Sequence, residues 1–507
     1  MFGFGSKRKT EDDSSPANVA DEPVSQVDDA DLDITQSQPF WTAILPVIAC
    51  GAGLFSDGYI NNVIGSVSTV LGREYGSVYN DSQAKKVVSA IAFAGTVIGQ
   101  LAFGFLSDRW SRTNSLLIST IILIVFTALA AGSYWNGEAT GMFTMLAIWR
   151  FFVGIGIGGE YPAGSVGCAE STGELKAGTR NMFFILFTNS MIDWGFVFGA
   201  FIPFVVAAAA KNEYMSTIWR TSLGIGVVFP LVLLVMRFRL KEPVEFSKHS
   251  FRHAKTPYRL VLKFYGWRLL IFLTYAFGIY SSTILANIFP QGQALTVVFG
   301  WNTVINLFYI PGTMLGAPLS DKIGPRYALA AGVSAQAIIG FIMAALYPHL
   351  AQASNVAAFA VVYGIFLSMG ELGPGNNIGL LAAKTCATGV RGQYYGIAAA
   401  IGKIGAFVGT YVYPYIEAAG GENAVASAQY PFYVSSSLCV VSAALAVFCL
   451  PHIGQDTITL EDKRFREFLE ANGYDTRQMG LNKTESLEDP KAVTAEKGGA
   501  AAAAAEA

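Results

Sequence analysis

The sequence has 507 residues, of which 52% are hydrophobic and 14% are charged, and 53 of them are glycine. This composition is typical of closely packed membrane-spanning helices and excludes a soluble domain as the main part of the chain. The formal net charge of −2 indicates little about partners, because residues 11–33 alone hold nine acids and no base.

The chain begins with a polar segment. We expect residues 1–40 to form a disordered cytosolic tail, because they are acidic and contain no long apolar run. They offer no apolar core that a signal peptidase could use, so we expect the N-terminus to be retained.

Twelve apolar runs follow this tail, and each is close to the ~20 residues needed to span a bilayer. The runs lie near residues 41–63, 88–106, 114–134, 143–166, 183–209, 218–236, 268–289, 293–319, 326–347, 358–383, 393–417 and 430–450. They predict an all-α membrane protein with 12 transmembrane helices.

The two halves of this region repeat each other weakly. Asp108 and Asp321 each follow Leu-Ser after a predicted helix, 213 residues apart, and Glu160 and Glu371 lie in matching helices 211 residues apart. This period predicts two pseudo-symmetric six-helix bundles. The predicted domains are the N-terminal tail, a first bundle at 41–236, a basic cytosolic linker at 237–267, a second bundle at 268–450, and a disordered cytosolic tail at 451–507.

Basic residues predict the orientation of the helices. Seventeen Lys and Arg residues fall in or beside the connections on one side, nine of them in 237–268, against five on the other side. By the positive-inside rule, both termini and the central linker are expected in the cytosol. Asn80, in Asn-Asp-Ser, then falls in an outer loop, where it is either a glycan acceptor or an unused sequon.

Five charged residues interrupt the apolar runs. A charge at membrane depth costs at least roughly 2.5 kcal/mol, so each of them needs a partner, a water-filled cavity or a function. They are Asp57, Glu160, Asp193, Glu371 and Lys403. Together they indicate a pathway for a solute.

The turn between the second and third predicted helices contains Gly104, Asp108 and Arg109 in a Gly-x-x-x-Asp-Arg pattern, and Asp321 lies in a weaker copy. With six plus six helices, this turn resembles the major facilitator superfamily. The resemblance implies a conformational latch on the cytosolic side, in which the Asp caps a neighbouring helix and the Arg pairs with acids. The alternative is a polar turn that only keeps the loop hydrated.

A narrower resemblance comes from a stretch within the fourth predicted helix, from Arg150 through four glycines to Glu160, Tyr161 and Pro162. This stretch is similar to the signature of the phosphate:proton symporter branch. Within that branch, residues 55–66, 191–195 and 277–284 look most like the fungal glycerophosphodiester permeases, which import glycerophosphoinositol or glycerophosphocholine with protons.

This resemblance implies roles for the residues that match the branch. Asp57 and Glu160 take part in proton coupling, Tyr161 donates a hydrogen bond to the substrate phosphate, and Lys403 contacts that phosphate. Two alternatives stay open: Asp57 is a protonated acid bonded to a neighbouring helix, or Lys403 only neutralises Asp193 or Glu371.

Two further regions bear on the substrate. Asn376 and Asn377 follow Gly-Pro-Gly, which opens the tenth helix for a ligand. Tyr280 matches a substrate-binding position of the seventh helix. Aligned on Tyr280, Ala276 and Phe272 stand where phosphate carriers of the branch have Asp and Trp. The missing acid suits a bulkier phosphodiester, and it makes Asp193 and Glu371 candidates for proton coupling.

The sequence therefore predicts a proton-coupled importer of glycerophosphodiesters in the plasma membrane, rather than an enzyme. The four histidines show no paired metal-ligand spacing, and we expect no metal and no cofactor, with protons as the coupling ion. The expected partners are a small-molecule substrate and the lipid bilayer, without nucleic acid, for a monomer. The alternatives are an inorganic phosphate:proton symporter and a sensor of the same fold that binds substrate without transporting it.

Overall fold

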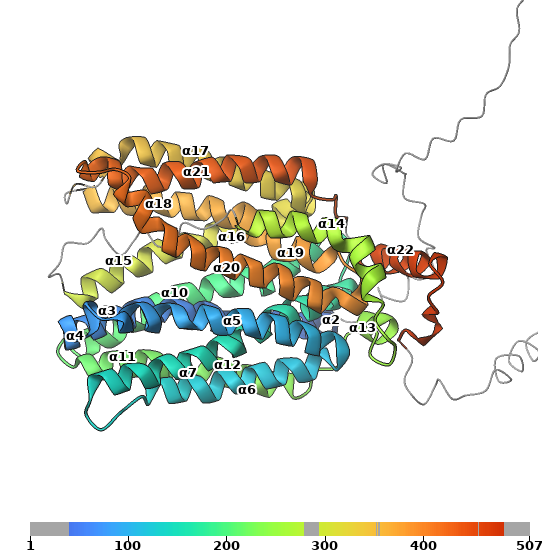
Figure 1. Ribbon diagram of the computed structural model, residues 1–507, viewed down its shortest axis with the longest axis horizontal. Coiled ribbons are helices and arrows are strands. Elements are labelled where there is room, and N and C mark those ends of the chain that lie inside the picture. The colour runs from blue at the N-terminus through green and yellow to red at the C-terminus, as the bar shows by residue number, and fades with distance from the viewer. Residues whose placement is uncertain (1–39, 278–293, 351, 353–354, 455, 481–507) are drawn as a thin grey trace, which may run out of the picture. The chain divides into compact units, whose positions relative to one another are not determined.

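The long apolar runs fold as helices, because only a helix satisfies its own backbone hydrogen bonds within a single membrane-spanning segment. The computed structural model describes residues 40–480 except 278–293, 351, 353–354 and 455 (Figure 1). Within that part of the chain, ten helical segments are long and apolar enough to cross a membrane. The chain is therefore an all-helical, multi-pass membrane protein.

The first half contains eleven helices, several of which join end to end into one span. They are α2 (Phe40–Gly51), α3 (Leu54–Tyr75), α4 (Ser77–Asn80), α5 (Gln83–Arg109), α6 (Arg112–Ala131), α7 (Ala139–Glu160), α8 (Val166–Ser171), α9 (Arg180–Phe187), α10 (Asn189–Ala209), α11 (Met215–Ile225) and α12 (Val228–Arg237).

The second half is built in the same way. Its described helices are α14 (Tyr258–Phe277), α15 (Leu295–Leu307), α16 (Tyr309–Ile323), α17 (Pro325–Leu350), α18 (Val356–Gly370), α19 (Asn376–Lys384), α20 (Arg391–Ala418) and α21 (Ala424–Cys449).

Two of the twelve predicted spans are not among the ten apolar segments. The span predicted at 268–289 begins in α14 and continues into residues outside the described part of the chain. The span predicted at 393–417 is α20, a 28-residue helix that contains Lys403. The count of twelve stays a prediction.

The segments predicted as linker and C-terminal tail contain helices that the sequence patterns did not indicate. Helix α13 (Val244–His249) lies within the linker, and α14 begins ten residues earlier than the predicted second bundle. Helix α22 (Thr457–Ala471) lies within the tail that we expected to be disordered, and it is amphipathic. Its buried face, which includes Phe465 and Leu469, packs against α14 and the linker. Disorder was therefore the wrong expectation for this stretch.

Among the described residues, each half contains one π-helical turn, and the two turns lie at matching places. Tyr161–Ser165 follows α7, and Glu371–Gly375 follows α18. Their prolines, Pro162 and Pro374, are 212 residues apart, so the weak sequence repeat corresponds to a repeat of backbone geometry. π-Helical turns interrupt regular helices and occur often at functional sites.

The two halves contact each other along several helix pairs, including α9 with α16. Helix α5 packs on α20, and α10 packs on α15. The contact between α5 and α20 is close because glycine faces backbone: a Cβ atom on Gly396 would lie 2.4 Å from the carbonyl oxygen of Gln100. These contacts place side chains of both halves around a shared interior.

Candidate functional site

A cavity of about 590 Å³ lies between the two halves. Its volume falls in the range of small-molecule sites. Its lining is rich in carboxamides and aromatic rings, with one described acid, Glu371, and one described base, Lys403. Other polar lining residues include Asn61, Asn62, Gln100, Tyr161, Asn189, Asn302, Asn306 and Asn376.

Lys403 and Tyr161 join the two halves at this cavity. The ammonium group of Lys403 lies 3.4 Å from the hydroxyl oxygen of Tyr161 and 5.1 Å from the centre of its ring. The Tyr161 hydroxyl in turn donates a hydrogen bond to Asp57, which also accepts one from Asn61 at 2.5 Å. A base, a phenol and a buried carboxyl group are therefore linked across the interface.

Lys403 makes no ion pair with a carboxylate within the described residues. Within this part of the chain, no ion pair supports the alternative in which Lys403 only neutralises Asp193 or Glu371. The nearest acid along its hydrogen-bond chain is Asp57, which lies within electrostatic range. The cation therefore faces the cavity and is available to a ligand anion.

A second polar group forms around Asp193 and Glu371. Asp193 accepts a hydrogen bond from Thr313 of the other half, and Glu371 accepts one at 2.7 Å from Asn189. The same amide of Asn189 also lies 3.1 Å from the side-chain oxygen of Asn376. Each acid thus bonds across the interface to the opposite half, so its protonation state can influence how the halves contact.

Glu160 lies outside the cavity lining and has a fixed counter-charge. Both of its carboxylate oxygens accept hydrogen bonds at 2.7 Å from Arg237, and Ser119 donates to it at 2.7 Å. Arg237 is fully buried at the end of α12, at a position that the sequence analysis assigned to the linker. The pair compensates two buried charges, as such burial requires.

Two of the predicted latch residues, Asp108 and Asp321, cap helices of the opposite half. The carboxylate of Asp108 accepts the backbone N–H groups of Gly392 and Gln393, both at 2.8 Å, at the start of α20. Asp321 does the same for Asn181 and Met182, at 3.2 and 2.9 Å, at the start of α9. These two reciprocal caps follow the internal repeat. They define what we call the latch end of the bundle.

Gly104 permits the contact at the latch end, because a Cβ atom there would lie 2.7 Å from the carbonyl oxygen of Gly392. Arg109 differs from the expectation that it pairs with acids. It donates to two backbone carbonyls of the linker, those of Phe251 at 3.2 Å and Ala254 at 2.8 Å.

Arg112, three residues after Arg109, does pair with acids at the latch end. It bonds Asp108 at 2.5 Å and Glu170 at 3.0 Å. Glu170 also accepts a bond from Arg391 of the other half at 3.0 Å. This buried network holds the two halves together at the latch end.

Helix α22 extends the network. Asp462 accepts hydrogen bonds from the backbone N–H and hydroxyl of Thr388, at 2.6 and 2.5 Å, and lies 3.8 Å from Arg391. Burial raises the pKa of Asp462 to about 6, while Arg391 acts in the opposite direction. The neighbouring Glu461 pairs with Arg268 at 2.6 Å. The tail helix therefore contacts the latch end through two acids.

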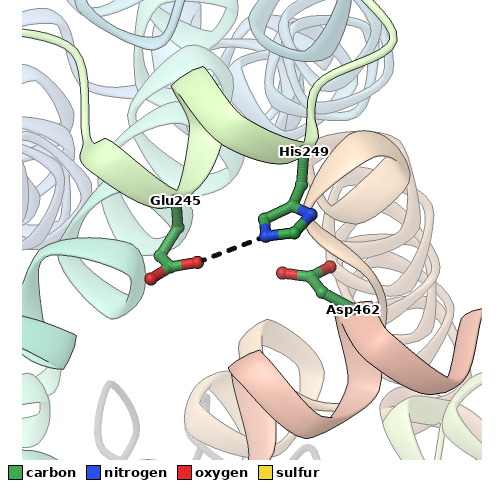
Figure 2. Close-up of side chains that lie close together, drawn as sticks. All are labelled: Glu245, His249 and Asp462. Carbon is green, nitrogen blue, oxygen red and sulfur yellow. Dashed lines mark ion pairs between the residues drawn. The ribbon is translucent and has the colours of Figure 1, made fainter. Parts of the chain in front are cut away.

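Figure 2 shows Asp462 beside Glu245 and His249 of α13. One ligand atom of each residue lies within 4.8 Å of the others, close enough for a metal ion. The carboxylate of Asp462, however, is already bonded to Thr388 and faces Arg391. Burial also lowers the pKa of His249, which favours its neutral form. We interpret this cluster as a junction between linker and tail.

Other predicted residues lie away from the cavity or outside the description. Asn377 is buried between Ser320, which donates to it at 2.7 Å, and its own helix, so it does not line the cavity. Tyr280 lies outside the described residues, as do the side chains of Phe272 and Ala276. The predictions for these three positions stay untested.

Sequence reasoning missed the basic partner of Glu160, two members of the ion-pair network at the latch end, and one polar residue of the cavity lining. Arg237 was missed because it directly follows an apolar run, where a base usually marks the membrane surface. Glu170 and Arg391 lie just beyond predicted spans, and only their pairing in space identifies them. Gln100 was missed because an uncharged residue in an apolar run gives no strong signal.

Comparison with known proteins agrees with this geometry. Residues 49–410 match the Major Facilitator Superfamily. A glycerophosphocholine permease of Candida albicans is 46% identical over 447 residues, which cover 86% of this chain and 84% of the permease. A major glycerophosphoinositol permease of the same organism is 45% identical over 452 residues, with the same coverage.

Among solved structures, the proton:xylose symporter XylE superposes with a TM-score of 0.66 at 17% identity. The match covers 84% of this chain and 98% of XylE. At this identity the likeness shows the fold alone. From the match over most of its spans and the high identity to these permeases, the chain belongs to the major facilitator superfamily of membrane transporters, in the same branch as the fungal glycerophosphodiester permeases.

Proposed function

We propose that this protein imports glycerophosphodiesters across the plasma membrane together with protons, by alternating access. The observation that carries the proposal is a hydrogen-bond chain that begins at Lys403 and Tyr161 in the wall of the central cavity and ends at the buried Asp57. An ammonium group is a compact charge suited to a phosphate oxygen. A buried carboxyl group that exchanges hydrogen bonds is suited to carry a proton.

The same chain supplies a mechanism for coupling. While Asp57 is ionised, its charge balances that of Lys403, which lies within electrostatic range. When Asp57 takes up a proton, the positive charge of Lys403 is left for an incoming phosphodiester, and the Tyr161 hydroxyl can donate to the phosphate instead. Proton and anion then bind cooperatively. A proton bound alone leaves the positive charge of Lys403 unbalanced, and an anion bound alone adds a negative charge to that of Asp57, so each ligand makes the binding of the other more favourable.

Asp193 and Glu371 are the other candidates for proton coupling. Both bond across the interface, so proton uptake would change contacts that must break when the cavity opens. Glu160 remains a candidate, but its ion pair with Arg237 provides a fixed counter-charge. Asp57 is therefore our first choice for the proton carrier.

The cavity supports an organic phosphodiester over inorganic phosphate as substrate. It is much larger than a phosphate ion needs, and it is lined by carboxamides and aromatic rings besides Lys403. Nearly equal identity to the glycerophosphocholine and glycerophosphoinositol permeases leaves both head groups possible. The distribution of basic residues supports cytosolic termini and a cytosolic latch end.

Competition uptake tests the proposal. Cells that lack endogenous carriers should accumulate labelled glycerophosphocholine or glycerophosphoinositol when they express this protein, and unlabelled phosphate should compete weakly. Preferred accumulation of inorganic phosphate would favour the alternative function. Saturable binding without any accumulation or exchange would instead indicate a sensor.

A further inference from the structure

Gln100 is a buried polar side chain with no partner. Its exposed fraction is 0%, it lines the central cavity, and neither its amide nitrogen nor its amide oxygen has a hydrogen bond within the described residues. Buried polar groups are nearly always paired, so an unpaired amide beside a cavity requires an explanation.

Other carboxamides of the cavity are already engaged. Asn61 donates to Asp57, and Asn189 donates to Glu371. The amides of Asn61 and Asn189 are thus already bonded to candidate proton carriers. Gln100 is not committed in this way, so its donors and acceptor remain for a ligand.

The backbone around Gln100 is held rigidly from two sides. A Cβ atom on Gly158 of α7 would lie 2.7 Å from the backbone nitrogen of Gln100, and one on Gly396 of α20 would lie 2.4 Å from its carbonyl oxygen. Close packing of this kind fixes the backbone position from which the Gln100 side chain extends. A fixed, unpaired donor and acceptor is what a preorganised subsite needs.

Gln100 lies at a different depth in the cavity from Lys403, the proposed phosphate-binding residue. The ammonium of Lys403 lies 5.9 Å from the ring centre of Phe93, whereas Gln100 lies seven residues farther along α5. Seven residues correspond to roughly 10 Å along a helix. The displacement is toward the latch end. Gln100 therefore reaches a part of the substrate other than the group bound at Lys403.

We propose that Gln100 forms a hydroxyl-binding subsite for the polyol part of the substrate, an inference that rests on the proposed function. A carboxamide offers two donors and one acceptor without a charge, which matches hydroxyl groups that both donate and accept. Two parts of the substrate class carry such hydroxyls: the glycerol common to all glycerophosphodiesters, and the inositol of one of them.

The test compares Gln100→Leu with the wild type in proteoliposomes, using labelled glycerophosphocholine and glycerophosphoinositol. Thr96→Val is the matched control, because Thr96 is buried in the same helix but bonds only the carbonyl of Ala92 and does not line the cavity. We expect Gln100→Leu to raise KM at least tenfold. A rise for both solutes identifies glycerol as the group bound, and a rise for glycerophosphoinositol alone identifies inositol.

Thermal unfolding without substrate separates a subsite from a structural role. Because Leu removes an unpaired buried amide, Gln100→Leu should unfold at the same temperature as the wild type or higher. KM values within twofold for both solutes, or a larger loss of unfolding temperature than in Thr96→Val, would overturn the inference. Failure of the proposed function would appear differently, as a wild-type protein that accumulates neither solute.

Discussion

The ammonium group of Lys403 lies 3.4 Å from the hydroxyl oxygen of Tyr161, and these residues come from opposite halves of the protein. The contact places the single described base of the cavity next to the phenol that bonds Asp57. Anion binding, proton binding and the interface between the halves therefore meet at one point. Substitutions along this chain should separate the three properties.

Removing the charge of Lys403 should weaken substrate binding most. We expect Lys403→Ala to raise the KM for a glycerophosphodiester about 100-fold, on the order of 3 kcal/mol, since it removes the cation that would pair with the substrate phosphate. Lys403→Arg should recover little, because a planar guanidinium does not replace a compact ammonium. Initial uptake rates give both values, with Lys86→Ala on the exposed face of α5 as control. A KM for Lys403→Ala within twofold of the wild type would move the anion site elsewhere.

Removing the proton site at Asp57 should uncouple transport without stopping exchange. Asp57→Asn keeps a hydrogen-bond partner for Tyr161 but cannot ionise, so we expect loss of pH-driven accumulation and retained exchange of labelled for unlabelled substrate. The exposed Asp81 provides the control Asp81→Asn. Undiminished accumulation by Asp57→Asn would exclude this residue as the proton carrier.

The ion pair between Glu160 and Arg237 should be mainly a stability element. Glu160→Gln alone leaves a buried guanidinium unpaired and should cost about 3–5 kcal/mol of folding free energy. The double variant Glu160→Gln/Arg237→Leu should recover most of this loss and still accumulate substrate. The measurements are thermal unfolding and pH-driven uptake of the same three proteins. A stable double variant that cannot accumulate substrate would instead assign Glu160 to proton coupling.

Asp462 should make the stability of the latch end depend on pH. Its pKa is raised from 3.8 to about 6, so the folded protein holds this proton more tightly than the unfolded chain does. Its contribution to stability is full below about pH 3.8 and is lost as the pH rises through 6. Asp462→Asn cannot lose a proton and should therefore gain stability over the wild type as the pH rises, by at most about 3 kcal/mol above pH 6.

Thermal unfolding between pH 5 and pH 8 measures this difference, with Glu467→Gln on the exposed face of α22 as control. His249 lies beside Asp462, and burial lowers its pKa, so the same comparison is repeated with His249→Gln in both proteins to remove any change in the imidazole's titration. A difference between Asp462→Asn and wild type that stays constant over this range would refute the assignment.

The sequence predicted the fold well because length and hydropathy alone define membrane helices. It also named Asp57, Glu371 and Lys403, because charged residues are rare at membrane depth, and Tyr161, because the resemblance gave that position a role. The structure brings Tyr161, Glu371 and Lys403 to the central cavity and bonds Asp57 to Tyr161, while their roles stay predictions. Asp108 and Asp321, which occupy matching positions of the internal repeat, cap matching helices of the opposite halves.

Partners that lie far apart in the chain could not be predicted in the same way. The counter-charge of Glu160 is 77 residues away, at Arg237, and the bond from Arg391 to Glu170 spans 221 residues. Spacing within one helix gives no information about such pairs. Helix α22 was missed for a related reason, because a charged amphipathic segment resembles a disordered tail until its apolar face meets a partner.

The central claim is that a proton gradient drives accumulation of a glycerophosphodiester through the site at Lys403 and Asp57. The most direct measurement is uptake of labelled glycerophosphocholine and glycerophosphoinositol into proteoliposomes that contain only this protein, with and without an inward proton gradient. We predict accumulation above equilibrium with the gradient, collapse on addition of a protonophore, and no accumulation by Asp57→Asn. Uptake that only equilibrates across the membrane, whatever the gradient, would contradict the account.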